Sequence, residues 1–289
     1  MSRDEIRRRE LSDFLRIRRA RVSPAEAGLP LGPRRRTPGL RREEVAQLAG
    51  ISATWYTWLE QRRSIRVSAG VLENLARVLR LDPIERTQLF QLALRQTTPN
   101  GLSHRHKVSP VIRRMLDQMD AIPALVMGPR WDVLGWNQAA RAFFVDFDNL
   151  PAAERNFVWL VFTSPGMRSL LVDWPRRARD AVALFRIDYG RHAGDLHFVQ
   201  LIEKLRSVSP EFGQWWPRHD VLPLGEGRLV YNHPAVGRLY LEHVGLTVRD
   251  NPELTLVMFV PVPELDSIAK LGEIFRSFKA AAGSKGRSS

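Results

Sequence analysis

The chain has 289 residues, of which 44% are hydrophobic and 26% charged, and it contains no cysteine. This length allows two domains with cores of their own, and the absence of cysteine excludes disulfides and thiolate metal sites. No stretch approaches the ~18 consecutive apolar residues that a membrane helix requires, and residues 1–10 lack the apolar core of a signal peptide, so a cytoplasmic protein is expected.

The formal net charge of +13 is concentrated at one end of the chain. Residues 1–107 contain 22 Lys and Arg against 11 Asp and Glu, whereas residues 108–289 contain 22 against 20. A general preference for arginine would spread the excess evenly along the sequence. The asymmetry therefore indicates a polyanionic partner, a nucleic acid, for the N-terminal third.

Residues 10–96 are predicted to form short helices separated by turn signals. A first helix begins near Ser12, and residues 22–37, rich in Pro, Gly and Arg, form a loop. The remaining helices follow from apolar spacing and from cap residues, and they are expected at 41–49, at 52–61, at 68–79 and from Asp82-Pro83 onward. This all-helical domain is assigned to residues 1–98.

The turn Ala49-Gly50-Ile51-Ser52 joins two helices of the lengths found in a helix-turn-helix. Gly50 can take a positive φ at the turn. Ser52 can cap the following helix, and its hydroxyl can also reach a phosphate. The segment from Arg41 to Gln61 is therefore predicted to be the DNA-binding element.

The helix at 52–61 has two different faces on a wheel of ~100° per residue. The residues expected to pack inward are Trp55, Tyr56 and Leu59. The outward arc carries no acid and suits base edges in a major groove; it consists of Ala53, Thr54, Thr57, Trp58 and Gln61. For Trp58, a place in the core is an equal alternative.

Arginine clusters flank this helix and are candidates for phosphate contacts, which position a protein on DNA without reading its sequence. They are Arg34, Arg35, Arg36, Arg41, Arg42, Arg62 and Arg63. Gln47 and Ser52 complete the predicted set of DNA contacts. The alternative is that the arginines form only a solvated face.

The run PGLRREEVAQLAGISATWYTWLEQRRSIRVSAGVLENLARVLRLDPIERTQLFQLA resembles the Xre-type helix-turn-helix of the MmyB-like regulators of actinobacteria and their relatives. The resemblance covers residues 9–96 and implies a DNA-binding domain. Members of that family carry a glycine just after the recognition helix, where this chain has Arg62. The resemblance thus implies a slightly different exit from that helix.

A polar stretch containing Pro-Asn-Gly predicts a linker at residues 99–108. Beyond it, strands are predicted at 124–127, 131–136, 227–231, 237–244 and 254–260. Helices are predicted at 110–119, 137–144, 180–189, 195–207 and 266–280. These elements form an α+β domain over residues 109–280, and residues 281–289 are expected to be a disordered tail.

Several phrases of the second part extend the resemblance in the family's order, among them PALVMGPRWDVLGWNQAARAFF, DWPRRARDAVALFR, SPEFGQWWPRHDV and HPAVGRLYLEHVGL. They are similar to the ligand-binding domain of MmyB-like regulators. The resemblance implies a PAS-like domain, in which a curved antiparallel sheet flanked by helices encloses an apolar pocket. For at least one branch of the family it also implies a fatty-acid-like ligand.

Six of the eight tryptophans lie in this second part. Indole rings with few neighbouring charges are good pocket lining, although for any single one of them a place in the core is the favoured interpretation. The candidate ligand contacts are Trp131, Trp136, Trp159, Phe162, Trp174 and His219. An acidic head group would pair with a cation or an imidazole, and Arg186, Arg191 or His219 could serve.

An enzyme is not expected, because the chain has no G-x-S-x-G, P-loop or G-x-G-x-x-G motif. His192, Asp195 and His197 form an HxxDxH run, but their spacing in a Gly-containing loop is not typical of a metal site, and no metal or cofactor is predicted apart from a lipophilic ligand. The apolar stripe at 110–119 packs either in the core or against a second copy of the chain.

The sequence therefore predicts an all-α helix-turn-helix domain followed by an α+β PAS-like domain. The predicted function is that of a homodimeric, sequence-specific transcription regulator that binds double-stranded DNA and responds to a small lipophilic ligand. In the alternative interpretation, the second domain binds no ligand and serves as a dimerisation or protein-interaction module.

Overall fold

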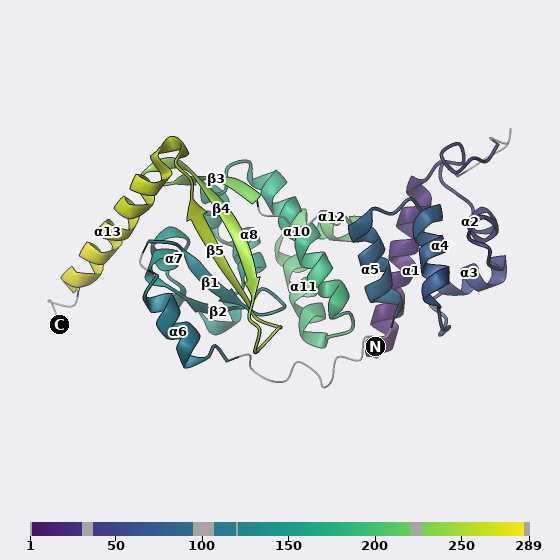
Figure 1. The fold of residues 1–289 in the computed structure, drawn as a ribbon, viewed down its shortest axis with the longest axis horizontal. Coiled ribbons are helices and arrows are strands. Elements are labelled where there is room, and N and C mark those ends of the chain that lie inside the picture. The colour runs from purple at the N-terminus through teal and green to yellow at the C-terminus, as the bar shows by residue number, and fades with distance from the viewer. Residues whose placement is uncertain (1, 31–36, 95–106, 120, 221–226, 286–289) are drawn as a thin grey trace. The chain divides into compact units, whose positions relative to one another are not determined.

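The computed structural model describes residues 2–30, 37–94, 107–119, 121–220 and 227–285, which form two compact units (Figure 1). Unit 1 comprises the described residues within Met1–Ser103, Arg186–Arg206 and Gly213–Pro223. Unit 2 comprises those within His104–Phe185, Ser207–Phe212 and Leu224–Ser289. A helical N-terminal region followed by a domain of mixed helices and strands confirms the predicted fold class.

Unit 1 begins with a helix that starts earlier than the sequence predicted. α1 spans Arg3–Arg21, with Ser2 as its N-cap. The Ser2 hydroxyl accepts a hydrogen bond from the Glu5 amide at 3.2 Å, and the Glu5 carboxylate accepts one from the Ser2 amide at 2.6 Å. The prediction of a start near Ser12 was wrong, because this serine is fully buried and its hydroxyl donates to the Glu60 backbone oxygen at 2.6 Å.

Four further helices follow close to the predicted positions: α2 (Arg42–Ala49), α3 (Ala53–Glu60), α4 (Ala69–Val78) and α5 (Pro83–Ala93). They enclose a core in which Phe14, Leu15, Leu40, Tyr56 and Leu75 have no exposed surface. The residues are apolar at helical spacing, so each short helix is stabilised mainly by the face that it buries.

Unit 1 also contains segments from the second half of the chain. These are the end of α10 (Trp174–Arg191), most of α11 (Leu196–Val208), and η3 (Trp216–Arg218), which follows α12 (Pro210–Trp215). Two glycines allow the close packing: a Cβ on Gly190 would lie 2.5 Å from the Gln88 amide, and one on Gly194 would lie 2.5 Å from the Arg3 carbonyl oxygen.

Unit 2 is built on an antiparallel sheet of five strands in the order β2-β1-β5-β4-β3. The strands are β1 (Ala124–Met127), β2 (Val133–Trp136), β3 (Gly227–His233), β4 (Gly237–Thr247) and β5 (Thr255–Pro261). All five were predicted, and β1 has the predicted bounds. The sheet places alternate residues of β5 on opposite faces, so that Leu256 and Met258 share one face while Val257 and Phe259 share the other.

Helices lie against both faces of this sheet. On the Leu256 face, α6 (Pro110–Asp117) contributes Leu116 to a small apolar cluster with Val126. Ring contacts join the opposite face, through Phe259, to Phe144 and Phe157. The other elements are α7 (Gln138–Phe143), η1 (Phe147–Asn149), η2 (Ala152–Glu154), α8 (Phe157–Thr163), α9 (Pro165–Leu170), η4 (Glu264–Asp266) and α13 (Ser267–Lys285).

Three short helices, α8, α9 and α12, were not predicted. They have six or seven residues each, too few for an apolar period to be recognised. The predicted linker lies outside the described residues except for Lys107 and Val108. In the predicted tail, α13 continues to Lys285, and the last four residues lie outside the described part.

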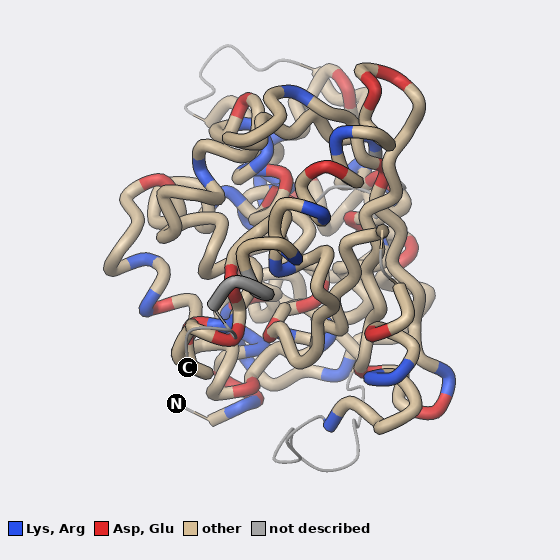
Figure 2. Tube along the Cα trace, turned by 90° about the vertical axis from the view of Figure 1, so that its left-hand side faces the viewer, with Lys and Arg blue, Asp and Glu red and all other residues tan. Residues whose placement is uncertain are grey.

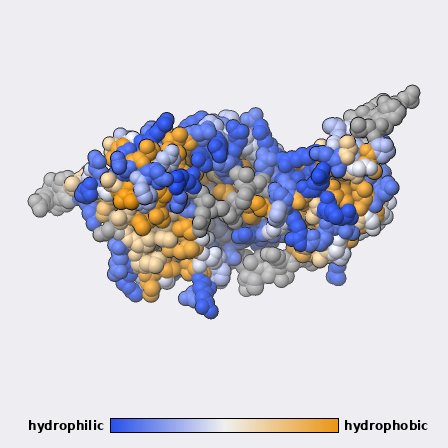
Figure 3. Space-filling model, turned by 45° about the horizontal axis from the view of Figure 1, so that its top comes forward, coloured by the Kyte–Doolittle hydropathy of each residue, from blue (hydrophilic) through white to orange (hydrophobic). Residues whose placement is uncertain are grey.

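Figures 2 and 3 show how charged and apolar residues are distributed over the molecule. Basic and acidic residues are intermixed along the trace in Figure 2. In Figure 3 apolar side chains are visible on the part that carries the sheet and also on the helical part. Among the strand residues, Leu246 and Val260 are exposed. Within the described residues, every helix is too short or too polar to cross a membrane.

Candidate nucleic-acid interface

The turn between α2 and α3 has the geometry that its sequence predicts. Gly50 caps α2 with φ 71° and ψ 34°, a left-handed conformation that glycine adopts without a steric penalty. The Ile51 amide donates to the Ala46 carbonyl oxygen at 2.9 Å. The Ser52 hydroxyl then accepts from the Trp55 amide at 3.1 Å, which fixes the start of α3. Two short helices are thereby held in a defined helix-turn-helix.

The two arcs of α3 differ in burial as the wheel predicts. Tyr56 and Leu59 are buried, and Trp55 packs against the same core with part of its surface exposed. Thr54 and Gln61 are exposed, and Thr57 and Trp58 are half-buried. Ala53 is also half-buried and contacts the core, so its side chain is the least accessible of the five candidate base contacts.

The remaining candidates lie around this helix. Arg41, Gln47, Ser52 and Arg63 are exposed, and the Arg63 guanidinium lies 5.5 Å from the centroid of the Trp58 ring. That contact holds a cation beside the outward arc of α3. Arg34, Arg35 and Arg36 lie outside the described residues.

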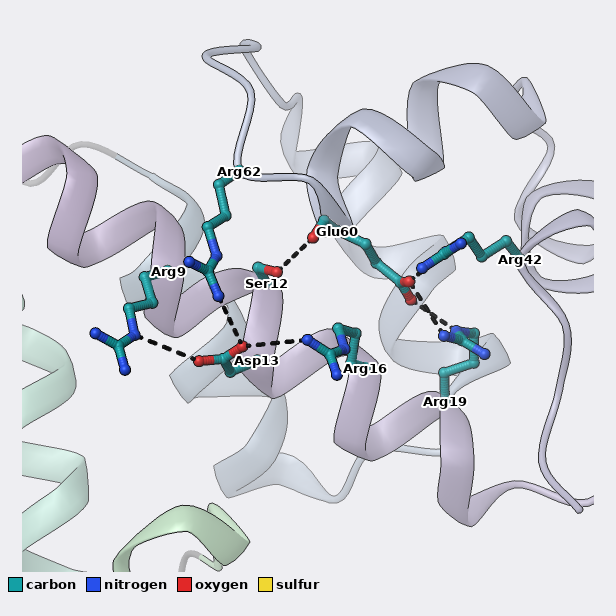
Figure 4. Close-up of polar contacts among 8 residues, drawn as sticks. All are labelled: Arg9, Ser12, Asp13, Arg16, Arg19, Arg42, Glu60 and Arg62. Atoms are coloured by element: carbon teal, nitrogen blue, oxygen red, sulfur yellow. Dashed lines mark hydrogen bonds and ion pairs between the residues drawn. The ribbon is translucent and has the colours of Figure 1, made fainter. Parts of the chain in front are cut away.

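Arg42 is tied to a buried carboxylate that the sequence pattern did not single out. Glu60, the last residue of α3, accepts from the Arg42 Nε at 2.6 Å and from the Arg19 Nε at 2.6 Å, with the Arg19 Nη2 at 3.1 Å (Figure 4). We call these three residues the Glu60 cluster. It joins the ends of α1 and α3 to the first residue of α2.

The Glu60 carboxylate stays ionised in this position. Its side chain has no exposed surface, and this burial alone would raise its pKa. The hydrogen bonds from Arg19 and Arg42 outweigh that effect and hold the pKa of Glu60 below its usual value. Arg42 remains 43% exposed, so part of its guanidinium can still face a phosphate.

Glu60 lies at the border between the two arcs of the wheel, beside the buried Tyr56. An acid at such a border, in a segment rich in arginine, is the one signal in the sequence that could have indicated the cluster. Its partner Arg19 is 41 residues away, and only the fold brings the two together.

Arg62 follows α3 in a left-handed conformation with φ 67°. It stands where the resembling family carries glycine, and the backbone conformation is one that glycine adopts readily. Its guanidinium lies 3.6 Å from the Asp13 carboxylate, which also faces Arg9 at 3.9 Å and Arg16 at 3.8 Å (Figure 4). Asp13 thus moderates the positive charge beside the outward face of α3.

The candidate ligand residues lie in different environments within unit 2. Trp131 packs edge-on to Phe185 at 5.7 Å, and Trp136 contacts Phe147 at 5.4 Å. Trp159 is half-buried at the start of α8.

Phe162 and Trp174 form a second aromatic pair, with their ring centroids 5.8 Å apart. The indole of Trp174 donates to the Val161 carbonyl oxygen at 2.8 Å. Five of the six candidates are therefore aromatic residues of this unit with part or all of their surface buried.

Comparison with known protein families identifies both parts of the chain. A model of the MmyB-like transcription regulator ligand binding domain matches residues 108–273, which is more than half of the chain. A model described as a helix-turn-helix domain matches residues 10–89. The chain belongs to the MmyB-like transcription regulators. It is a DNA-binding transcription regulator with a ligand-binding domain. No match was found among curated proteins.

His219, the sixth candidate, belongs to unit 1 of this MmyB-like regulator, not to unit 2. It is buried, and its Nδ1 lies 3.1 Å from the Arg186 Nη1. Because a guanidinium can only donate, Nδ1 accepts and the imidazole proton is on Nε2. Burial, followed by the charges of Arg186, Arg18 and Arg21, lowers the pKa of His219 to about 2. The ring is therefore neutral.

The HxxDxH run has structural partners in unit 1. The Nδ1 of His192 lies 2.9 Å from the Asp188 carbonyl oxygen. The Asp195 carboxylate accepts from the amides of His197 at 2.8 Å and Phe198 at 3.4 Å, and so caps α11. Within the described residues, no group of three or more His, Asp or Glu is arranged to hold a metal ion.

Proposed function

We propose that this regulator binds specific sequences of double-stranded DNA and that a small lipophilic, fatty-acid-like ligand in its second domain alters that binding. The observation that carries the DNA half is the outward arc of α3, which is free of acids and flanked by the exposed Arg41 and Arg63. The observation that supports the ligand half is the aromatic interior of unit 2. Both halves accord with the two family matches.

On DNA, α3 lies in the major groove with Thr54, Thr57, Trp58 and Gln61 toward the base edges. Arg41, Arg63 and the exposed part of Arg42 contact phosphates. Gln47, Ser52 and Ala53 complete the contact surface. The Glu60 cluster keeps α2 and α3 in one arrangement, so that phosphate and base contacts form together.

The ligand half of the proposal rests on a PAS-like second domain. Its strand order, β2-β1-β5-β4-β3, and the helices on the Phe259 face support that comparison. Rings of Phe144, Phe157, Tyr231 and Phe259 contact one another over this face. An alkyl chain inserted among such rings leaves water, which favours a lipophilic ligand over a polar one.

We further propose that the regulator acts as a homodimer in the cytoplasm and has no enzymatic activity. α6 supports a dimer, since Leu116 packs on the sheet while Val111 and Met115 on the same helix are 65% and 40% exposed. Two copies would place two recognition helices on a two-fold DNA site. Light scattering of the purified protein, with a Val111→Asp, Met115→Asp variant, tests this contact.

The ligand proposal is tested by extracting the purified full-length protein with organic solvent and analysing the extract by mass spectrometry. We expect a lipophilic molecule in stoichiometric amount. Titration of the delipidated protein with palmitate should then change its DNA affinity, and DNA should change palmitate affinity by the same factor. Hexadecanol, which lacks the carboxylate, is the matched control for the head group.

If repeated preparations yield no lipid, and palmitate leaves DNA binding unchanged, the ligand proposal is wrong. The second domain would then be a dimerisation or protein-interaction module. The DNA half of the proposal stands independently of that result, because it is measured with the same protein in the absence of lipid.

A further inference from the structure

Two fully buried arginines meet on the face of α1 that points away from Glu60. Arg18 is 2% exposed and Arg186 is 1% exposed. Arg186 comes from the end of α10, and its partners there are Glu10 at 3.3 Å, the His219 ring, and the Trp216 carbonyl oxygen. Its guanidinium also stacks on the Trp216 ring, 3.7 Å from the centroid. We call Glu10, Arg18, Arg186, Trp216 and His219 the Arg186 cluster.

His219 connects the two arginines. Its ring accepts from Arg186, and its backbone oxygen accepts from the Arg18 Nη2 at 2.5 Å. The residue has φ 53°, a left-handed conformation that is unusual for a residue other than glycine. Such strain persists only where the surrounding contacts enforce it. The backbone of His219 is therefore held in place by its contacts with α1.

The segments that carry this cluster belong, in sequence, to the ligand-binding domain. Arg186–Arg206 and Gly213–Pro223 lie within residues 108–273, which match that domain's family model, yet they pack with the helix-turn-helix in unit 1. We call their described residues the docked segments. α10 runs without a break from Trp174 to Arg191 and contributes residues to both units.

α1 contacts two different partners with two different faces. Glu10 and Arg18 meet the docked segments, whereas Ser12 and Arg19 hold Glu60 at the end of the recognition helix. Residues 10 and 12 are about 200° apart around a helix, so these faces are nearly opposite. α1 therefore connects the docked segments to the end of α3 through contacts on both of its faces.

The docking contact is of a kind that can be released. The cost of desolvation nearly cancels the electrostatic attraction within a buried ion pair. The docked and undocked states of an interface built on such pairs therefore differ less in free energy than those of an apolar interface. Packing is also incomplete, because a groove of about 580 Å³ remains between α1 and α11, lined by Ile6, Arg9, Asp13, Ile202 and Arg206 among others. These features suit an element with two states of similar free energy.

We propose that the docked segments are a conformational control element of this regulator: docked on α1 they hold Glu60 and the recognition helix in the DNA-binding arrangement, and undocking lowers DNA affinity. The inference deepens the proposed function, since ligand occupancy would act by shifting this equilibrium. It makes Arg186 and Glu10 positioning residues for DNA binding, although neither touches DNA.

The test uses the full-length protein and a duplex of random sequence at fixed salt, so that neither operator nor ligand need be known. Arg186→Met and Glu10→Gln remove the ionic docking with little change in volume. Both variants should speed amide hydrogen exchange in the docked segments and weaken duplex binding by about tenfold. Lys204→Met, at an exposed position of α11 outside that groove, is the control and should change the affinity by less than about twofold.

A disulfide lock provides the converse experiment, because the chain has no cysteine of its own. A Cβ at Gly190 would lie 2.8 Å from the Gln88 side-chain carbonyl carbon, so Gln88→Cys with Gly190→Cys can join α5 to the end of α10. The oxidised protein should bind the duplex at least as tightly as the wild type. Oxidation should also restore binding in the Arg186→Met background, and dithiothreitol should reverse that restoration.

The proposal is overturned if the variants show faster amide exchange in the docked segments but bind the duplex with normal affinity. It is also overturned if the disulfide weakens duplex binding. If Arg186→Met does not fold, Glu10→Gln and the lock alone decide the matter. Failure of the wild-type protein itself to bind duplex DNA would instead refute the proposed function, so the two failures are distinguishable.

Discussion

Unit 1 uses arginine in two opposite ways. On the side of α3, Arg41 and Arg63 are exposed and surround a helix face without acids. On the far side of α1, Arg18 and Arg186 are buried with Glu10, Glu85 and a neutral histidine. Exposed arginines act on a partner through charge, whereas buried arginines act on their own fold through geometry.

This difference changes what the charge asymmetry of the sequence means. The excess of +11 over residues 1–107 includes Arg18 and Arg19, whose guanidiniums are bonded to carboxylates inside the unit. Such residues contribute to the net charge, but their guanidiniums are engaged within the fold. The DNA partner is therefore better inferred from the exposed arginines beside α3 than from the net charge of the segment.

The largest expected effect comes from Glu60→Ala. This change removes the carboxylate that joins Arg42, which is partly exposed, to Arg19, which is largely buried. Arg19 would remain largely buried without its partner, so we expect the free energy of unfolding to fall by about 3–5 kcal/mol. Urea unfolding monitored by circular dichroism measures this decrease.

Glu73→Ala is the matched control, because Glu73 pairs with Arg86 on the surface, where both side chains are nearly half exposed. That variant should lose less than about 1 kcal/mol. Equal decreases in the two variants would contradict the distinction between buried and exposed pairs.

The second prediction separates base recognition from phosphate binding on the exposed side. Thr54→Ala or Trp58→Ala should reduce the preference for a selected operator over random DNA by about 1–3 kcal/mol for each side chain truncated. Arg41→Ala with Arg42→Ala should weaken binding to all sequences and flatten the salt dependence by about one slope unit for each phosphate no longer neutralised. Fluorescence anisotropy over a salt series measures both.

Equal weakening on operator and random DNA from Thr54→Ala or Trp58→Ala would contradict their placement at base edges. Arg42 alone should cost more stability than Arg41 alone, because only Arg42 has a hydrogen bond with the Glu60 carboxylate. Comparing these two single variants thus separates the structural role of an arginine from its role toward DNA.

The third prediction concerns the buried side and pH. The unfolded protein takes up a proton on His219 near pH 6.5, whereas the folded protein does so only near its lowered pKa of about 2. The stability contributed by His219 is therefore present above pH 6.5 and is lost as the pH falls. From pH 7 to pH 5 the free energy of unfolding of the wild type should fall by about 2 kcal/mol on this account.

His219→Asn should show a smaller decrease, since an amide oxygen can still accept from Arg186 but does not titrate. The comparison is between wild-type and variant urea unfolding at the two pH values, which cancels the contributions of other groups. An equal decrease in both proteins would mean that His219 is accessible to protons in the folded state.

Local sequence patterns predicted the elements on the α3 side of unit 1, where the arginines are exposed. Gly50 and Ser52 signal their turn and cap through backbone conformation alone. The buried side depends on contacts between distant residues: Arg186 meets Glu10 across 176 positions, and Arg18 meets His219 across 201. No periodicity contains that information. For the same reason, the sequence grouped His219 with the tryptophans of the second unit.

The smallest expected effect concerns Arg62, an exposed arginine with a backbone conformation that favours glycine. Arg62→Gly removes a left-handed strain of about 1 kcal/mol and an exposed ion pair with Asp13 that contributes less than that. We therefore expect a small gain in melting temperature together with a lower salt slope in DNA binding. Arg63→Gly is the matched control, because Arg63 is adjacent and exposed but lacks a positive φ, so glycine there should lower the stability. If both variants are less stable than the wild type, then Arg62 is held by its ion pair with Asp13, and its charge belongs with the structural arginines and not with the DNA-binding ones.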